Sequence, residues 1–530
     1  MHRRAGREAN WLGRVAALAV AAVAIVLACL PVAATSAAFI DSEYGSFDLT
    51  AEAPPAPRPA INIGYRGNYL GATQVGLSQS GSAAYVWGYR DGGLSGTGAK
   101  VDPTADISVV KLPGGLKIAG ITGGSNKGNS QYYNAAIGVL AQDGSVWTWG
   151  VADEHRLGRP VTDANRWLPG KVEIPGKVID LQSGANSFVA LTDDGDLYTF
   201  GAVSSESYST YGALGQGAAA ISGTVPRRIL TKVHSFGVAL NSVWAVVAPG
   251  WTNTTYSGND TADQGSTTAP GERGEVLFWG YNELNGSGAA SGDPDLKNTY
   301  CAKPTRLSTT AVLNQLLWAG SAAGDQNETL GVAMGSPEDS GTFRQMTGSV
   351  YGNQVLLADG RLFTWGYSAN GYYGSGNNTG MSTRQTMVPT QADLGGLKVQ
   401  AVAHTMRLTM LLDQTGTAWI YGRSGPGEEA VFPKPDGTVP IVSSSSPVRI
   451  EGDEAPGWQA GGITGMAGNG NMSFMLTRDD GSLWLAGGSD IESKVNDFAL
   501  VRDHWTSAGN TVRTDAAQPI LQVDFSGLPD

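Results

Sequence analysis

A short pattern of apolar and polar positions recurs along this chain. Its clearest copy is Asp143–Gly150, with the sequence Asp-Gly-Ser-Val-Trp-Thr-Trp-Gly. Further copies are Asp194–Gly201, Arg273–Gly280, Asp359–Gly366, Thr415–Gly422 and Asp480–Gly487, with an altered first copy at Gly81–Gly88. A pattern that returns in this way predicts repeated copies of one structural unit, here seven.

The aligned columns of the pattern describe a strand that is apolar on both faces. The position before the last glycine and the position two residues earlier are each aromatic in six of the seven copies. A strand of this kind must be covered on both sides, as in the blades of a propeller. In four copies an Asp-Gly pair precedes the strand, which is the signal of a tight hairpin. We therefore predict an all-β fold, a seven-bladed β-propeller over residues 61–530.

The two ends of the array suggest how the ring closes. Each unit has an upstream strand, a second strand, the hairpin and the aromatic strand, but the first unit lacks its upstream strand. At the other end, Ile520–Gly527 has the form of the upstream segment Val178–Gly184, and no unit follows it. We expect a C-terminal strand within residues 519–527 to complete the first blade beside Tyr69–Leu77, which would close the ring.

The N-terminus has the composition of an export signal. Four arginines lie in residues 2–14, followed by the apolar run Val15–Leu30 and by small residues up to Ala38. This predicts a signal peptide over residues 1–38, cleaved after Ala38, and a Pro-rich linker over residues 39–60. Two alternatives remain: a retained membrane anchor, with membrane contact only through residues 12–38, and a lipoprotein site at Cys29.

The junction Ala37–Thr50 resembles the alternate export signals of bacterial biofilm-matrix fibre proteins. In both, Ala-Ala-Phe is followed by a polar stretch with Asp and then by a Phe-Asp-Leu segment, here Phe47–Leu49. The resemblance implies a Gram-positive bacterium and a secreted or cell-surface destination. An ordinary signal peptide followed by a linker is the alternative.

A glycine-containing loop motif follows the aromatic strand in most units, as in His155–Gly158, Gly212–Gly217 and Asn370–Gly374. Together with the strand pattern, this motif resembles the repeat of the regulator of chromosome condensation family. The resemblance implies a seven-bladed propeller that is used for binding. Members of the family exchange nucleotide on a small GTPase, dock on chromatin or, in a secreted bacterial relative, inhibit β-lactamases, and none of these roles transfers automatically.

Charge and candidate chemistry narrow the functional classes. The net charge of −12 and the absence of a Lys/Arg cluster after residue 14 argue against nucleic acid as a partner. The body of the chain contains a single cysteine, Cys301, so it forms no internal disulfide. The histidines are scattered, and no catalytic or metal motif is present. We expect no enzyme activity, no metal and no cofactor.

These observations predict an exported, non-catalytic β-propeller that binds an unidentified extracellular or cell-surface protein. A structural component of a surface matrix or fimbrial assembly is the alternative, and a secreted hydrolase or lyase is the lesser one. The predicted contacts lie on the loops after the aromatic strands: Tyr89, His155, Arg156, Tyr208, Tyr211, Tyr281, Tyr367, Tyr372 and Tyr373. The insertion Pro249–Arg273, with Trp251 and Tyr256, is either a second contact surface or a solvated loop.

Overall fold

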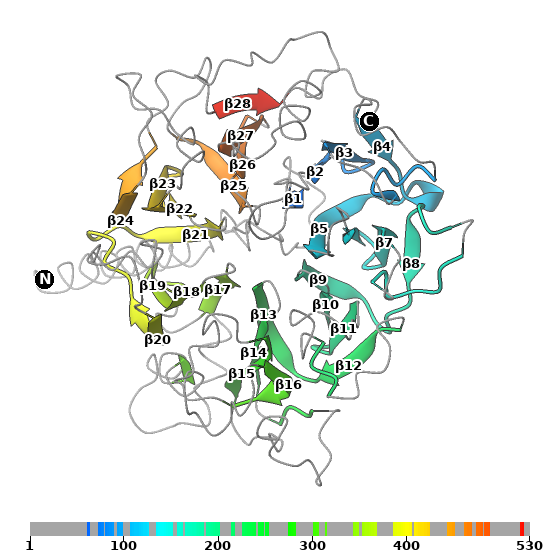
Figure 1. Cartoon of the computed structure of the whole chain (residues 1–530), viewed down its shortest axis with the longest axis horizontal. Coiled ribbons are helices and arrows are strands. Elements are labelled where there is room, and N and C mark those ends of the chain that lie inside the picture. Colours follow the sequence, from blue (N-terminus) through cyan, green and yellow to red (C-terminus); the bar gives the residue numbers. More distant parts are fainter. Residues whose placement is uncertain are drawn as a thin grey trace, which may run out of the picture. The chain divides into compact units, whose positions relative to one another are not determined.

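The computed structural model contains seven four-stranded antiparallel sheets that are arranged as blades around a common axis (Figure 1). It describes strands, turns and parts of loops between residues 61 and 523. Residues 1–60 and 524–530 lie outside the described residues, as do internal segments, the longest of which are 202–213, 254–273, 282–299, 315–342, 368–384, 424–442 and 488–519. Among the residues that are described, no helical segment has the length and hydropathy needed to cross a bilayer.

Each blade is built from four consecutive strands. The inner strands are β1 (Ile61–Ile63), β5 (Ile118–Asn126), β9 (Val178–Ser183), β13 (Val233–Ala239), β17 (Phe343–Gly348), β21 (Val399–His404) and β25 (Ile463–Gly468). The second strands are β2 (Thr73–Leu77), β6 (Asn134–Ala141), β10 (Ser187–Thr192), β14 (Ser242–Val247), β18 (Gly352–Leu357), β22 (Leu408–Asp413) and β26 (Ser473–Arg478).

The third strands carry the repeated aromatic pattern, and the fourth strands form the rim of the ring. The third strands are β3 (Ala84–Gly88), β7 (Val146–Gly150), β11 (Leu197–Gly201), β15 (Glu275–Tyr281), β19 (Leu362–Tyr367), β23 (Ala418–Arg423) and β27 (Leu483–Gly487). The fourth strands are β4 (Ser108–Val110), β8 (Gly170–Val172), β12 (Arg227–Leu230), β16 (Tyr300–Thr305), β20 (Gln385–Gln391), β24 (Ser443–Arg449) and β28 (Ile520–Val523). A 3-10 turn, η2 (Pro113–Gly115), precedes β5.

The third strands are buried on both faces, which confirms the interpretation of the aromatic columns. Trp149, Trp279 and Trp365 are fully buried, and so are Thr148 and Phe278 in the column between. Large apolar side chains from neighbouring blades fill the space between sheets, as where the rings of Trp244 in β14 and Trp365 in β19 meet edge to face at 5.3 Å. The hydrophobic core therefore lies between the blades.

The Asp-Gly turns join neighbouring blades through backbone hydrogen bonds. The turn glycines adopt positive φ, for example 84° at Gly144 and 80° at Gly195. The carbonyl of Gly144 accepts a hydrogen bond from the amide of Val178, the first residue of the next inner strand, at 3.0 Å. The same bond recurs at four other junctions, from Ile118 to Gly81, Val233 to Gly195, Val399 to Gly360 and Ile463 to Gly416. We call the side of the ring that carries these turns the turn face.

The expected closure by the C-terminal strand is wrong in its detail. Strand β28 pairs with β27 and is the fourth strand of the last blade, not a member of the first. The upstream strand that the first unit seemed to lack is β1, which pairs with β2 and also contacts β25 and β26 of the last blade. The ring is thus closed by packing between the first and last blades, because each blade is complete in itself.

Candidate protein-interaction site

The loop motif after the aromatic strand is a structural device. In the second blade, Thr148 Oγ1 donates to the carbonyl of the buried Leu157 at 2.7 Å, and in the third blade Thr199 Oγ1 donates to that of Leu214 at 2.6 Å. The glycine of the motif then packs on the aromatic ring of the next blade. A Cβ at Gly158 would lie only 2.1 Å from Cδ2 of Phe200.

The same contact recurs at two other junctions. A Cβ on Gly96 would approach Nε1 of Trp149, and one on Gly215 would approach the ring of Trp279, each at 2.9 Å. Because the third strands end beside these loops, all of the connections from third to fourth strands begin on one side of the ring, opposite the turn face. We call this side the loop face.

Arg156, one of the predicted contact residues, lies within this motif and is excluded as a binding residue. Arg156 is fully buried, so its side chain is not available at the surface to bind a partner. Tyr281 and Tyr367 are the last residues of β15 and β19, at the loop face. The other predicted positions lie outside the described residues: Tyr89, His155, Tyr208, Tyr211, Tyr372 and Tyr373. The described structure therefore does not show them together.

A buried arginine holds the loop of the second blade in a defined shape. Arg159 donates through Nε to the carbonyl of Thr148 at 3.3 Å, and through Nη2 to the carbonyls of Asn165 and Leu168 at 3.3 and 2.9 Å. Burial lowers the pKa of its guanidinium. By satisfying three carbonyls at once, this side chain fixes residues 165–168 against the end of β7.

The fixed loop presents an aromatic and apolar surface that the sequence interpretation did not single out. Trp167 is half-buried, and Leu168 is 40% exposed. The guanidinium of Arg166 lies 5.2 Å from the ring of Trp167, a cation–π distance. Trp and Arg are the residue types that most often dominate protein interfaces. Residues Arg166, Trp167 and Leu168, which we call the second-blade patch, are the best candidate contact surface among the described residues.

The first blade supports this patch from the side. The amide of Gly98 donates to the carbonyl of Trp167 at 3.2 Å, and Gly93 lies directly against its indole ring. In the sequence, Trp167 is the one tryptophan of the loop between β7 and β8. A single tryptophan indicates a contact surface less clearly than the clustered tyrosines on which the predicted contacts were based.

The insertion in the fourth blade begins as part of the core. Trp251 is fully buried, so its interpretation as a contact residue is wrong. Its Nε1 donates to Glu275 at 3.2 Å, and Glu275 also pairs with the guanidinium of Arg306, whose Nη2 lies 2.6 Å from Oε1. The amide of Val276 donates to Asn314 at 2.7 Å. Glu275 thus ties together both ends of the insertion and the segment that follows β16, while residues 254–273, Tyr256 included, lie outside the described residues.

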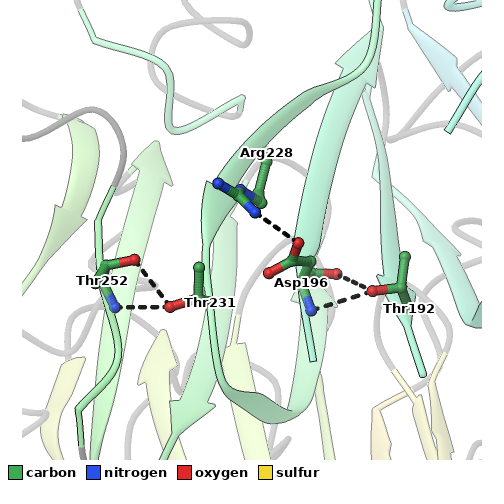
Figure 2. A network of polar contacts seen from close by, with 5 residues as sticks. All are labelled: Thr192, Asp196, Arg228, Thr231 and Thr252. Carbon is green, nitrogen blue, oxygen red and sulfur yellow. Dashed lines mark hydrogen bonds and ion pairs between the residues drawn. The ribbon is translucent and has the colours of Figure 1, made fainter. Parts of the chain in front are cut away.

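The start of the insertion is also fastened to the third blade (Figure 2). Thr252 donates its amide to Thr231 Oγ1 at 2.8 Å, and Asn253 forms a β-bridge with Leu230 at the end of β12. On the same blade, Arg228 pairs with Asp196 at 2.8 Å. Only Thr231 and Lys232 link β12 to β13. We infer that residues 251–253 replace the packing that longer links supply at other junctions.

Turn aspartates that the structure describes are engaged in local hydrogen bonds. The carboxylates of Asp143 and Asp480 accept the amides of Ser145 and Ser482 at 2.9 and 2.8 Å, which is the local hydrogen bond of a tight turn. Across the part of the chain that the structure describes, no group of three His, Cys, Asp or Glu side chains is placed to hold an ion.

The fold and this geometry can be compared with known proteins. Residues 143–191 match the model of the Regulator of chromosome condensation (RCC1) repeat. The chain is 23% identical over 374 residues to the Ultraviolet-B receptor UVR8 of Arabidopsis thaliana, which covers 69% of this chain and 67% of UVR8. It is 40% identical over 63 residues to the Regulator of chromosome condensation of Xenopus laevis, which covers 12% of this chain and 15% of that protein.

Solved structures agree on the fold. Prp20p of Saccharomyces cerevisiae, described as binding Gsp1p and histones, superimposes with a TM-score of 0.53 at 14% identity, covering 84% of this chain and 86% of Prp20p. Yeast RCC1 (Prp20) bound to Kap60 gives 0.56 at 14% identity, covering 88% of each chain. The chain therefore folds as a seven-bladed β-propeller that is similar to those of RCC1-type proteins.

Proposed function

We propose that this protein is an exported, non-catalytic propeller that binds a protein partner at the cell surface or outside the cell through its loop face. The second-blade patch supports the proposal most directly, because it combines an accessible Trp, a stacked Arg and an exposed Leu on a loop held by Arg159. Such rigid aromatic anchors bind with little loss of side-chain entropy. The N-terminal export pattern supports the extracellular location.

The first experiment asks whether a partner uses this patch. The mature chain and a Trp167→Ala variant, both immobilised, are exposed to surface proteins of the producing organism and to secreted enzymes of competitors. A purified partner is then titrated against both. We expect the substitution to weaken binding by about 2 kcal/mol or more. It should lower the melting temperature only modestly, since Trp167 is half-buried. Equal affinity for both chains would remove the patch from the proposed interface.

The predicted tyrosines need a more careful substitution. Tyr373 follows Trp365 at the same sequence distance as the buried Leu157 follows Trp149, so its column in the motif is a core column. Tyr373→Leu keeps an apolar side chain of the kind that the motif uses, whereas Tyr373→Ala would mix lost packing with lost binding. Tyr211→Ala and Tyr373→Leu therefore test the third and fifth blades. If both bind normally while Trp167→Ala does not, the contacts lie on the second blade.

Export and the competing functions are tested separately. The intact mass of secreted protein should correspond to a chain that begins at Phe39. Recovery only from membranes with residues 1–38 attached would establish the anchor. Co-fractionation with surface fibres would favour the structural role, and a turnover that is abolished by one carboxylate or His substitution would favour an enzyme.

A further inference from the structure

The inner strands share an irregularity near the turn face. In six of the seven sheets, the second residue of the inner strand is skipped in the pairing with the second strand, as in a β-bulge. The skipped residues are Ala119, Ile179, His234, Arg344, Gln400 and Thr464. A bulge changes the direction of a side chain. The inner strands surround the axis of the ring (Figure 1), and the skipped residue is the second residue in each of these six strands.

The side chain of the skipped residue differs from blade to blade. Ala119 in the second blade is buried and Ile179 in the third is apolar. The next four blades carry His234, which is exposed, and Arg344, Gln400 and Thr464, which are half-buried. Polar side chains that stay accessible on strands whose residues are mostly buried are available to bind a ligand.

Arg344 is the unusual member of the group. Its guanidinium makes no hydrogen bond or ion pair with any residue that the structure describes. Surrounding protein lowers the pKa of Arg344 by desolvation. A partly desolvated cation without a partner destabilises the folded chain unless an anion neutralises it.

The carboxylate of Asp180 in β9 does not serve as that anion. One of its oxygens, Oδ2, accepts from Gln182 Nε2 at 3.1 Å, and the same nitrogen bonds the carbonyl of Phe236 at 3.2 Å. These bonds direct Asp180 toward β13, whereas Arg344 stands one blade further on, in β17. Burial raises the pKa of Asp180 to about 7, so its charged form is disfavoured as well.

We propose that Arg344, between His234 and Gln400, binds an oxyanion, a carboxylate or a phosphate, at the axis of the ring on the turn face. The planar guanidinium matches two oxygens of such a group, and the imidazole and amide N–H groups are further donors. The neighbouring inner strands supply these donors from three consecutive blades. The site is independent of the loop-face interface, so either proposal stands if the other fails.

The test titrates succinate and inorganic phosphate separately into the full chain, with calorimetry and the imidazole NMR signals of His234 as readouts. We expect saturable one-to-one binding of one of the two anions in the millimolar range or tighter, with a shift of the His234 signals. Arg344→Gln should weaken this binding about tenfold or more. Arg227→Gln, the same change on the exposed rim strand β12, should leave it unchanged.

Thermal unfolding gives a second readout that does not depend on the affinity measurement. Without anion, Arg344→Gln should melt at or above the wild-type temperature, since it removes a desolvated charge. Added anion should raise the melting temperature of the wild type and of Arg227→Gln, but not of Arg344→Gln. If Arg344→Gln does not fold, His234→Gln and Gln400→Ala take its place in both assays. Absence of saturable binding to the wild type, or binding that survives these substitutions, would overturn the proposal.

Discussion

Individual glycines set how closely neighbouring blades can approach. Gly158 lies at the loop face with φ of 63°, and its missing Cβ leaves room for the ring of Phe200 in the next blade. Gly395 has nearly the same φ, 62°, but nothing lies within 4 Å of the position of its Cβ. A comparison of Gly158 with Gly395 therefore distinguishes the cost of backbone strain from the cost of steric overlap.

Substitution of these two glycines should therefore differ in effect. Gly395→Ala should lower the free energy of unfolding by about 1 kcal/mol through strain alone. Gly158→Ala should lower it by about 3 kcal/mol, because the same strain is joined by overpacking against Phe200. Denaturant unfolding of both variants measures the difference. An equal decrease in the free energy of unfolding for both variants would show that Phe200 can move to accommodate the added Cβ without an energetic cost.

Asp180 makes stability depend on pH. Its pKa in the folded chain is about 7, raised by burial from an ordinary value near 3.8. The folded state therefore holds a proton that the unfolded state releases, and this contribution to stability is present below pH 3.8 and is lost as pH rises through 7. Asp180→Asn should equal the wild type at low pH and exceed it in stability above pH 7.

The comparison must be made between the two chains at each pH. Burial lowers the pKa of His404 to about 3, so this residue contributes in the opposite direction and loses stability as pH falls. Because both chains contain His404, its effect cancels in the difference. A stability difference between them that does not change from pH 4 to pH 8 would contradict the assigned shift of Asp180.

The sequence predicted the core at residue level better than it predicted the surface. The aromatic columns fall between blades because a strand that is apolar on both faces must be covered on both faces. Arg156 was placed on the surface because it lies in a loop after an aromatic strand, but the motif that contains it packs inward. Trp167 is accessible only because Arg159 and Gly93 shape its loop, and such long-range support leaves no local pattern.

Among the strands, the regular ones were predictable and the outer ones were not. The second and third strands are apolar and joined by Asp-Gly turns, so their existence follows from the pattern. The outer strands are short or polar, as in β8, where Val172 alone is buried, and β24, which begins with four serines. Strand β1 has three residues and follows a Pro-rich stretch. Without a visible fourth strand, β28 was assigned to the wrong blade.

The insertion of the fourth blade should behave as a core element at its start. Trp251→Ala should lower the free energy of unfolding by about 3–5 kcal/mol, because a fully buried indole leaves a cavity and Glu275 loses a donor. Trp251→Phe should lose less, since most of the packing stays. Thermal melts of both variants test this order. If the Trp251→Ala chain were as stable as the wild type, the assignment of Trp251 to the core would be wrong.

For the molecule as a whole, the seam between the first and last blades is the place where the ring can open. A chain that begins at residue 67 lacks β1, which belongs to the first blade and contacts β25 and β26 of the last. A chain that ends at residue 518 lacks β28, which only covers the outer edge of β27. Relative to the chain 61–530, the first truncation should reduce the melting temperature or soluble yield more than the second. The reverse order would place the closure at β28.

Since no blade borrows a strand from the opposite end of the chain, the polypeptide order and the spatial order coincide at every junction. A circular permutant that joins the two present ends by a flexible linker and begins instead in the exposed link 173–177 would retain every strand pairing. By the same logic, a duplication or loss of one contiguous stretch of the gene would add or remove an entire blade. The number of blades in this architecture is therefore open to change by a single recombination event.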